Sequence, residues 1–347
     1  MKKNTFQIAT FFILTVIVFG CQKETPVIKE VVVPTLPETP YNYRAINGPV
    51  SDSYVQQINN EMATLGRVLF YDRHLSQNNS TSCGSCHLQQ FAFADGKRFS
   101  DGLNGKKTTR NSMAISNMIM QTSFFWDSRA TKLERQVMMP IENHIEMGVE
   151  NLGVLPDKLA NLEYYKELFK NSFGTEDITE SRISRALAMF LKSMISVGSK
   201  FDQGAFQNHE NLNLKEQLGL ELFRGKAKCW TCHSTSIFTG WGVQNIGLDL
   251  VYDDKGWSSG RFKIPSLKNI ALTAPYMHDG RFETLEEVVN HYNEGVKPHP
   301  SLSWRLRNSS GPQRLNLSDF EKSNLVAFLE SLTDYEYITD PRYSNPF

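Results

Sequence analysis

The sequence predicts a mostly α-helical fold made of two similar modules. Residues 179–197 and 318–332 place apolar side chains with the 3.6-residue period of an amphipathic helix. The second stretch begins at Ser318-x-x-Glu321, which is the pattern of a capping box. Strand-like alternation is rare and short along the chain. Helices therefore account for most of the regular structure that we expect.

The second module is predicted by an internal repeat. Leu65-Gly66 and then Leu69-Phe70 precede one polar loop, while Leu218-Gly219 and then Leu222-Phe223 precede another. Each loop carries a C-x-x-C-H motif. We interpret the repeat as one module used twice, and the simpler alternative is a chance likeness of two amphipathic helices.

The N-terminus has the pattern of an export signal. Lys2-Lys3 is followed by an apolar stretch, residues 11–19, that is too short to span a bilayer. Gly20-Cys21 ends this stretch, and a small residue before cysteine favours cleavage there with a lipid placed on Cys21. We expect a signal peptide over residues 1–20 and a periplasmic protein anchored by that lipid. Because Phe19 fits a lipobox imperfectly, ordinary cleavage or an uncleaved anchor are alternatives.

Composition divides the remaining chain into a tether and two domains. Residues 21–50 are rich in Pro, Glu, Thr and Val, which is typical of an extended segment. Residues 202–213 are polar and contain a glycine, so we place a domain boundary there. The predicted domains are residues 51–205 and 206–347.

The charge pattern gives no sign of a nucleic-acid or membrane-surface partner. The chain has 37 basic and 37 acidic residues, a formal net charge of zero, and the two signs are interspersed. Nothing in this pattern favours nucleic acid or an electrostatically bound membrane.

Apart from Cys21, the four other cysteines belong to the two C-x-x-C-H motifs, whereas a disulfide framework would scatter them.

The two motifs, Cys83-Gly-Ser-Cys86-His87 and Cys229-Trp-Thr-Cys232-His233, predict covalently attached haem. Two thiols add across the haem vinyl groups, and the adjacent histidine supplies an axial nitrogen to the iron. A thioredoxin-type dithiol or a zinc site with four thiolates are the alternatives. Neither needs a histidine directly after the second cysteine. We therefore predict two haem c groups.

The ligand on the other face of each iron is less constrained by the residues alone. No histidine lies between Leu88 and Asn143, so the first iron is expected to be open, unless Met113 or Met118 caps it. For the second iron the sequence leaves five candidates, which are Met277, His278, His291, Tyr292 and His299.

These residues resemble the bacterial di-haem cytochrome c peroxidase family, which includes the MauG-type enzymes. The resemblance spans about Asn60 to Thr333 and is carried by motifs that occur in order: L-G-R-V-L-F-Y-D, C-G-S-C-H, T-R-N-S-M, F-F-W-D-S-R, I-E-M-G, L-F-R-G-K-A-K-C-W-T-C-H, I-P-S-L-K-N-I-A-L-T-A-P-Y-M-H-D-G-R-F and T-L-E-E-V-V. It implies two cytochrome c-like haem domains packed around a shared interface. The N-terminal haem would react with peroxide and the C-terminal haem would transfer electrons.

The family's functional residues fall on particular positions. Trp126 matches the tryptophan between the haems, where the alternative is an ordinary core tryptophan. Glu146 matches the distal acid/base that moves a proton during O–O cleavage, although by itself it would be one surface glutamate among many. Gln136 and Pro140 match residues of the same distal pocket. His144 has no counterpart, and we expect it to face solvent.

A calcium ion between the haem domains is also implied by the resemblance. Asn111 matches its side-chain ligand, and Thr273 and Pro275 match its backbone carbonyl ligands. Oxygen donors of this kind suit a hard cation. Such an ion would fix the geometry between the haems.

Two positions depart from the usual peroxidase pattern and follow the MauG-type branch. Residues 100–106 lack the histidine that caps the first iron in many relatives, so that iron is expected to be open in the oxidised protein. The position of the usual axial methionine falls on Tyr292, a hard anionic ligand that would stabilise oxidised iron. His291 is the second choice for this ligand and Met277 the third.

The resulting hypothesis is an oxidoreductase that reduces hydrogen peroxide at the N-terminal haem. Electrons would come through Trp126 and the C-terminal haem from a small cytochrome c or a cupredoxin. One alternative is MauG-type oxidation of side chains in a partner protein, and another is a di-haem electron carrier without catalysis. The sequence leaves the oligomeric state open, a homodimer included.

Overall fold

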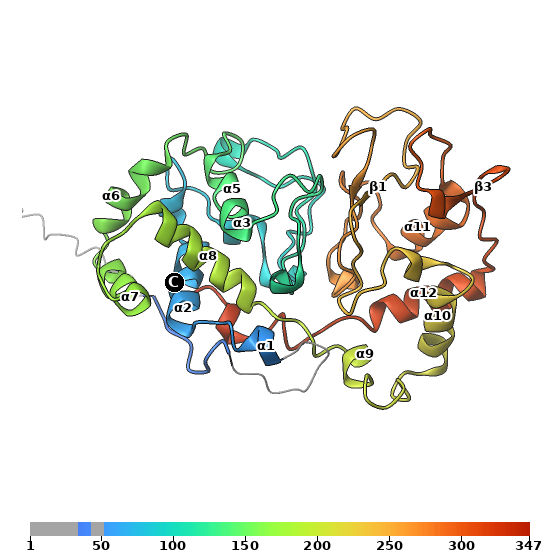
Figure 1. The fold of residues 1–347 in the computed structure, drawn as a ribbon, viewed down its shortest axis with the longest axis horizontal. Helices are drawn as coiled ribbons and strands as arrows, with labels where there is room; N and C mark the ends of the chain where they lie inside the picture. The colour runs from blue at the N-terminus through green and yellow to red at the C-terminus, as the bar shows by residue number, and fades with distance from the viewer. Residues whose placement is uncertain (1–33, 43–51) are drawn as a thin grey trace, which may run out of the picture. The chain divides into compact units, whose positions relative to one another are not determined.

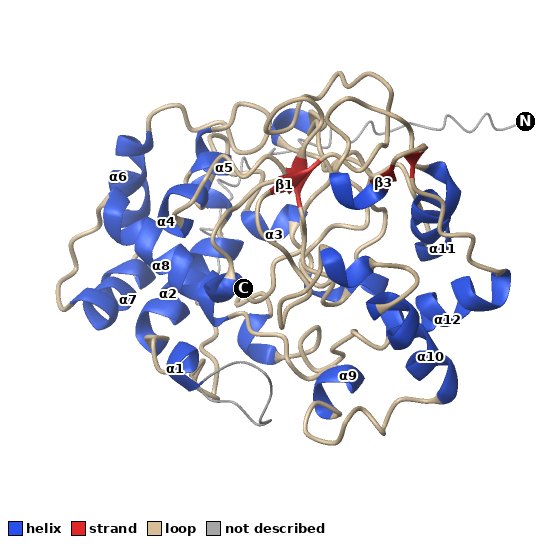
Figure 2. Ribbon diagram, turned by 45° about the vertical axis from the view of Figure 1, so that its right-hand side comes forward, coloured by secondary structure: helices blue, strands red, loops and turns tan. Residues whose placement is uncertain are grey.

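The computed structural model describes residues 34–42 and 52–347. The expected signal peptide and Cys21 lie outside the described residues. Helices and loops dominate, as expected, and the strands have two residues each (Figure 2). None of the described helices combines the length and apolar character needed to cross a bilayer. The described α-helices and strands are α1 Asp52–Val55, α2 Asn60–Tyr71, α3 Cys83–Cys86, α4 Leu133–Gln136, α5 Met139–Glu142, α6 Leu155–Ala160, α7 Tyr164–Phe173, α8 Glu180–Ser193, α9 Lys200–Gln203, α10 Leu214–Arg224, β1 Val243–Gln244, β2 Phe262–Lys263, α11 Leu285–Asn290, β3 Arg307–Asn308, β4 Gly311–Pro312 and α12 Asp319–Glu330.

Both helices expected from periodicity form, but each is shorter than its apolar pattern. Helix α8 begins after Thr179, whose hydroxyl accepts a hydrogen bond from the backbone of Arg182. Helix α12 begins after Ser318, and the expected capping box with Glu321 is present. Strands β1 and β2 form one antiparallel pair, and β3 and β4 form another.

The first half of the described chain is packed around the crossing of α2 and α8. Gly66 lies at this crossing, where a Cβ atom would overlap the carbonyl oxygen of Ala186 and crowd Phe190. Only glycine therefore permits this close approach of two helices. Figure 1 shows α2 and α8 together in this half, well apart from α10 and α12.

The second half repeats the same crossing with α10 and α12. A Cβ atom on Gly219 would overlap the carbonyl oxygen of Asn324 and crowd Phe328. Leu65-Gly66 and Leu218-Gly219 thus do the same task, which confirms the internal repeat. The sequence likeness reflects shared packing rather than chance.

An aromatic ring follows the glycine in each copy and links the helix pair to its haem motif. The Phe70 ring lies 5.4 Å from Phe190 and 6.3 Å from Phe93. In the second half, Phe223 lies 5.1 Å from the Phe328 ring and 5.7 Å from Phe238. Edge-on and tilted pairs such as these add to the energy of burial.

Residues near the C-terminus return to the first half (Figure 1). Tyr337 and Tyr343 belong to the first hydrophobic core, although both lie within the predicted second domain. The Tyr343 hydroxyl donates to the carbonyl of Ser193 at 2.8 Å, and Arg67 Nε donates to the carbonyl of Ser344 at 2.6 Å. Part of the expected tether packs there too, because Tyr41 is buried beside Phe190.

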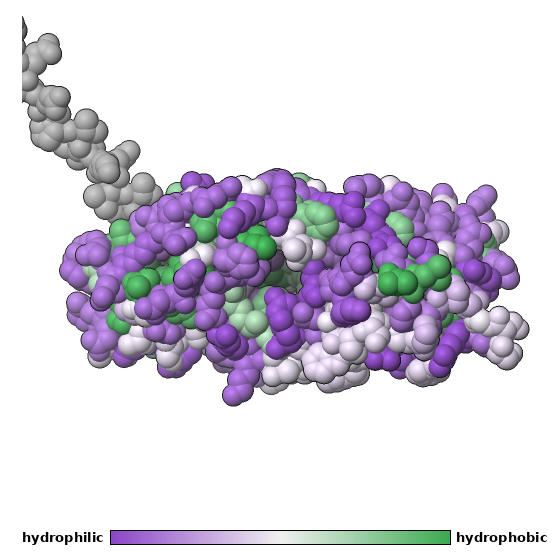
Figure 3. Space-filling view, turned by 90° about the horizontal axis from the view of Figure 1, so that it is seen from above, coloured by the Kyte–Doolittle hydropathy of each residue, from purple (hydrophilic) through white to green (hydrophobic). Residues whose placement is uncertain are grey.

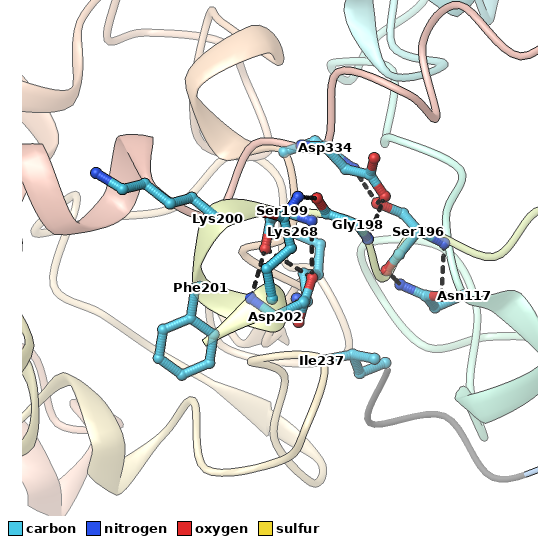
Figure 4. A network of polar contacts seen from close by, with 12 residues as sticks. Asn117, Ser196, Gly198, Ser199, Lys200, Phe201, Asp202, Ile237, Lys268 and Asp334 are labelled. Atoms are coloured by element: carbon cyan, nitrogen blue, oxygen red, sulfur yellow. Dashed lines mark hydrogen bonds and ion pairs between the residues drawn. The ribbon is translucent and has the colours of Figure 1, made fainter. Parts of the chain in front are cut away.

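A buried polar network lies where the chain passes from one half to the other (Figure 4). Lys268 and Asp202 form an ion pair with both side chains fully buried. Asp202 also accepts hydrogen bonds from the amide and hydroxyl of Ser199. The polar stretch that marks the predicted boundary therefore begins with a core residue. The boundary at residues 205 and 206 stays a prediction.

Asp334 connects the same network to the first half of the chain. This carboxylate accepts from Ser196 Oγ at 3.0 Å and from the Gly198 amide at 2.8 Å. The side chain of Asn117 exchanges two hydrogen bonds of 3.0 Å with the backbone of Ser196. Because these groups are buried, each bond satisfies a polar atom that would otherwise destabilise the fold.

Candidate active site

Both C-x-x-C-H motifs line one continuous cavity of about 840 Å³. The lining comes from both halves of the chain and is mostly apolar, which suits a large planar cofactor. The face drawn in Figure 3 is hollowed near its middle, with apolar surface beside the hollow. The predicted site residues that line this cavity are Cys86, His87, Asn111, Trp126, Gln136, Pro140, Glu146, Cys229, Cys232, His233, Thr273, Pro275 and Tyr292.

The first motif is presented by helix α3 and the turn that follows it. His87 Nδ1 lies 2.6 Å from the carbonyl oxygen of Phe93 and 3.4 Å from the hydroxyl of Ser112. A carbonyl can only accept, so Nδ1 carries the proton and Nε2 keeps its lone pair for a metal. The histidine is thereby held in the tautomer that an iron ligand requires.

The second motif has the same arrangement. His233 Nδ1 lies 2.8 Å from the carbonyl oxygen of Phe238. Phe93 and Phe238 both have a left-handed backbone, with φ of 62° and 53°. This conformation is uncommon for a bulky side chain, and its presence in both copies shows one local design used twice.

The four thiols fit haem attachment better than the alternatives. Burial raises the pKa of Cys83 and of Cys229 to about 12, whereas a thioredoxin-type dithiol needs a lowered pKa. Within residues 34–42 and 52–347, no three His, Cys, Asp or Glu side chains gather to hold a metal ion. A zinc site with four thiolates would have to bring the two cysteine pairs together.

The distal residues expected around the first motif all come from the first half of the chain and line the cavity. Gln136 ends helix α4 and Pro140 lies in helix α5, while Glu146 lies in the loop beyond. The amide oxygen of Gln136 is buried without a hydrogen-bond partner. A buried polar atom of this kind needs a partner, and a bound ligand or water in the cavity can supply it.

Glu146 is held where its carboxyl group senses little solvent. Burial raises its pKa, and the positive charge of Arg129 opposes that rise. Its negative charge in turn contributes to the raised pKa of Cys83 and Cys86, so the three side chains are close enough to interact. Glu146 is thus a partly shielded acid beside the first motif, and not a plain surface glutamate.

The histidine-free loop, residues 100–106, packs directly behind Glu146. The amide of Leu103 lies 2.7 Å from the carbonyl of Ile145 and 3.1 Å from that of Glu146. Met113 and Met118, the alternative caps, both line the cavity. His144 is exposed, as the sequence predicted.

Trp126 joins the two halves. Its indole nitrogen donates to the carbonyl of Asn111 at 2.9 Å, and its own carbonyl accepts from the Lys263 amide at 2.6 Å. Its side chain packs against the cluster of Leu248, Tyr252 and Phe262 in the second half. Trp126 therefore contacts both halves of the chain and lines the cavity that both motifs share.

A chain of ion pairs around Trp126 was not predicted from the sequence. Arg110 contacts Asp127 at 2.7 Å and Asp254 at 2.7 Å, and Arg129 contacts Asp127 at 2.9 Å. Arg110 holds the pKa of both aspartates below the usual range. Asp254 lies 144 residues from Arg110, so no local pattern could reveal the pair.

The candidates for the second axial ligand are separated by their surroundings. Tyr292 lies in a π-helix, His291–Gly295, and lines the cavity near Cys229 and Cys232, whose charges help burial to raise its pKa. His291 is not part of the lining, because its Nε2 lies 3.0 Å from the carbonyl of Ile246. Met277 also lines the cavity. His278 lines the cavity as well and stacks on Phe262, whereas His299 is not part of the lining and contacts the hydroxyl of Ser301.

The residues expected to bind calcium are part of the lining of the same cavity. Asn111, Thr273 and Pro275 all contribute to the lining. The amide nitrogen of Asn111 donates to the carbonyl of Lys97 at 2.9 Å, which leaves its side-chain oxygen as an available donor to a cation. These are neutral oxygen ligands of the kind that calcium accepts.

Fold and site together define a c-type cytochrome with two haem-attachment sites on one cavity. The family described as "Di-haem cytochrome c peroxidase" matches residues 60–210. The methylamine utilization protein MauG of Methylorubrum extorquens is 34% identical over 287 residues, or 78% of each chain. The cytochrome c551 peroxidase of Nitrosomonas europaea is 33% identical over 304 residues, or 83% of this chain and 85% of its own.

A solved structure agrees with these relatives. The crystal structure of a MauG-like protein associated with microbial copper homeostasis has a TM-score of 0.75 and 31% identity, covering 93% of this chain and 99% of that one. The chain belongs to the di-haem cytochrome c peroxidase family. It is an oxidoreductase with two haem c groups, as the sequence predicted.

Proposed function

We propose that this protein reduces hydrogen peroxide on the side of the cavity that carries Glu146 and Gln136. Reduction breaks the O–O bond and consumes two protons and two electrons, which gives two waters. The electrons come from oxidation of an external donor at the second half of the chain. When bound, the haems supply the iron at which peroxide reacts and the store of electrons between the two halves.

The chain's own residues supply protons, polarity and an electron path. Glu146 accepts a proton from peroxide and returns it to the departing oxygen. The amide of Gln136, whose oxygen is unsatisfied, holds polar ligands beside it. Trp126 carries electrons between the halves, because its ring is in contact with both. The observation that carries the proposal is the single cavity shared by both C-x-x-C-H motifs and Trp126.

The first experiment mixes the fully oxidised holoprotein with one equivalent of hydrogen peroxide and no reductant. We expect a rapid change in the visible and near-infrared spectrum, because no histidine in residues 100–106 caps the first iron. A protein that reacts only after addition of one electron would instead have a capped iron. A protein that reacts under neither condition would be an electron carrier.

The second candidate function is oxidation of side chains in a partner protein, as in MauG-type enzymes. It is favoured by Tyr292 on the cavity wall, where the resemblance predicts a MauG-like axial ligand. Here the electrons for peroxide would come from the partner's side chains and not from a small cytochrome c or cupredoxin. Mass spectrometry of the partner after peroxide addition distinguishes the two, because only this function leaves an oxidised residue.

Replacing Tyr292 by phenylalanine is expected to change the absorption and electron paramagnetic resonance signals of one haem only. The hydroxyl is the group proposed to bind iron, while the ring would keep its packing in the π-helix. The control is His291→Gln, which keeps a polar group at Ile246 and should leave both spectra unchanged. If His291→Gln moved the signals and Tyr292→Phe did not, the ligand would be His291.

Removing calcium is expected to slow the exchange of electrons between the haems without detaching either one. The proposed ion binds Asn111, and Asn111 also accepts the indole hydrogen bond of Trp126, so loss of the ion would loosen the path. The measurement is the rate of inter-haem electron transfer after treatment with a chelator. The rate of electron transfer should recover when Ca²⁺ is added and not when Mg²⁺ is added. An unchanged rate in metal-free protein would show that no calcium ion supports this path.

The proposed location is the periplasm, with a lipid on Cys21 as the membrane anchor. This rests on the signal-like residues 1–20, which lie outside the described structure. Replacing Cys21 by serine should release the protein from the membrane fraction. A variant that stays in that fraction would indicate an uncleaved anchor.

A further inference from the structure

Positive charge is concentrated in two segments of the second half. Residues 222–248 and residues 296–318 contain no aspartate or glutamate, although the whole chain has a net charge of zero. The first segment includes the haem motif of Cys229, Cys232 and His233. The basic residues of the two segments are Arg224, Lys226, Lys228, Lys297, Arg305, Arg307 and Arg314.

The fold brings these segments together beside the second haem motif. Lys228 Nζ donates to the side-chain oxygen of Gln313 at 2.8 Å, and the Gln313 amide donates to the carbonyl of Leu306 at 2.8 Å. The hairpin of β3 and β4 is the stretch of chain that connects Leu306 to Gln313. Arg305 is near enough to Cys232 for its charge to affect that thiol.

Five of the cations have no carboxylate partner within the described part of the chain. They are Arg224, Lys228, Arg305, Arg307 and Arg314, and we call them the basic rim. The two other cations are neutralised, because Lys226 pairs with Glu321 and Lys297 pairs with Asp249. Four members of the basic rim are exposed, and Arg305 is partly buried against the ring of Trp304 at 4.6 Å.

The basic rim adjoins the cavity, and exposed tryptophans neighbour its residues in the sequence. Lys228 and Leu306 both line the cavity, as does Cys229. Trp304 is 68% exposed in the middle of the basic residues, and Trp230 is 37% exposed within the haem motif itself. Exposed tryptophan with arginine is the composition of a protein-binding surface, where charged surroundings steer the partner.

We propose that the basic rim is the docking surface for a small redox protein with an acidic face. The inference rests on the proposed function and specifies its partner. Each docked partner gives up one electron to the second half, so two partners are oxidised for each peroxide that is reduced to water. Opposite charge speeds encounter. The basic rim also adjoins the cavity wall that carries Cys229 and Cys232, where the second haem would be attached.

The probe is a small ferrocytochrome c used in two forms. Its unmodified surface is basic, and succinylation of its lysines gives an acidic surface around the same redox centre. Binding of each form to the oxidised holoprotein is measured by calorimetry at low salt without peroxide. Oxidation of each form is then followed by stopped flow with peroxide. Binding tests the surface alone, whereas a protein that does not react with peroxide contradicts only the proposed function.

The variant reverses two charges of the basic rim, Arg305→Glu with Arg307→Glu, since neither side chain lines the cavity. Its matched control reverses Lys170 and Arg185 to glutamate, because both are exposed on the first half. The pair Arg305→Gln with Arg307→Gln is a milder version. Unchanged haem spectra and an unchanged reaction with peroxide show that each variant is intact.

The acidic probe is expected to bind and to be oxidised at least about tenfold faster than the basic one at low salt, with the advantage lost at high salt. The rim variant should lose that advantage and the control should keep it. Equal behaviour of the two probes, or equal loss in the control, would overturn the proposal. So would a wild-type protein that binds vesicles of anionic phosphatidylglycerol but not the acidic probe.

Discussion

Replacing Glu146 by glutamine is expected to slow the reaction with peroxide by about 10² to 10⁴, the usual contribution of a positioned acid/base. The amide keeps the size of the side chain but cannot exchange a proton. Because Glu146 contributes no haem ligand, both haem spectra should be unchanged. The measurement is the second-order rate of the peroxide reaction by stopped flow. A rate within about twofold of the wild type would remove this role.

Glu142→Gln is the matched control, since Glu142 lies four residues earlier and pairs with Arg135 outside the cavity. The pH profile gives an independent test. Glu146 must be ionised to take a proton from peroxide, and burial raises its pKa above 4.5. As the pH is lowered, the rate should therefore begin to fall before the pH reaches 4.5. Glutamine at this position should remove the fall.

Replacing Lys268 by methionine is expected to lower the free energy of unfolding by about 3 to 5 kcal/mol. The change leaves the buried carboxylate of Asp202 with only the hydrogen bonds from Ser199. Lys268 Nζ also lies 5.8 Å from the centre of the Phe238 ring, and the backbone carbonyl of Phe238 accepts a hydrogen bond from His233 Nδ1. The loss should therefore be accompanied by a disturbed second haem. Urea unfolding of the holoprotein, followed by circular dichroism and haem absorption, measures both effects.

A comparison with an exposed pair separates burial from charge. Lys166 contacts Glu163 at 2.8 Å with both side chains exposed, so Lys166→Met should cost less than about 1 kcal/mol. Replacing both buried partners, Lys268→Met with Asp202→Leu, should recover part of the stability, because no unpaired charge remains. A Lys268→Met protein as stable as Lys166→Met would show that the buried pair does not hold the halves together.

The features that the sequence predicted well depend on short segments. The C-x-x-C-H motifs place thiols and imidazole within five residues, and the capping box at Ser318 needs only four. The repeat is visible because Gly66 and Gly219 each permit a close crossing of two helices, and each follows a leucine in the sequence. Local patterns of this kind survive in the sequence because nearby residues make the contacts.

The rest of the site depends on contacts between distant segments, which periodicity does not encode. Arg110 and Asp254 are far apart in sequence, and each looks like an ordinary surface charge there. The preference for Tyr292 over His291 came from the family resemblance. Its physical reason needs the π-helix and the carbonyl of Ile246, since both determine which of two neighbouring side chains faces the cavity.

The return of the C-terminal residues to the first half affects the order in which the protein can be completed. Tyr337 packs on Phe93, which holds His87, and its hydroxyl donates to the carbonyl of Ile115. A chain made from its N-terminus presents the first haem motif early, but Tyr337 and Tyr343, which complete its core, come much later. Attachment of the first haem can therefore take place on an open half, which closes only when these residues have been made.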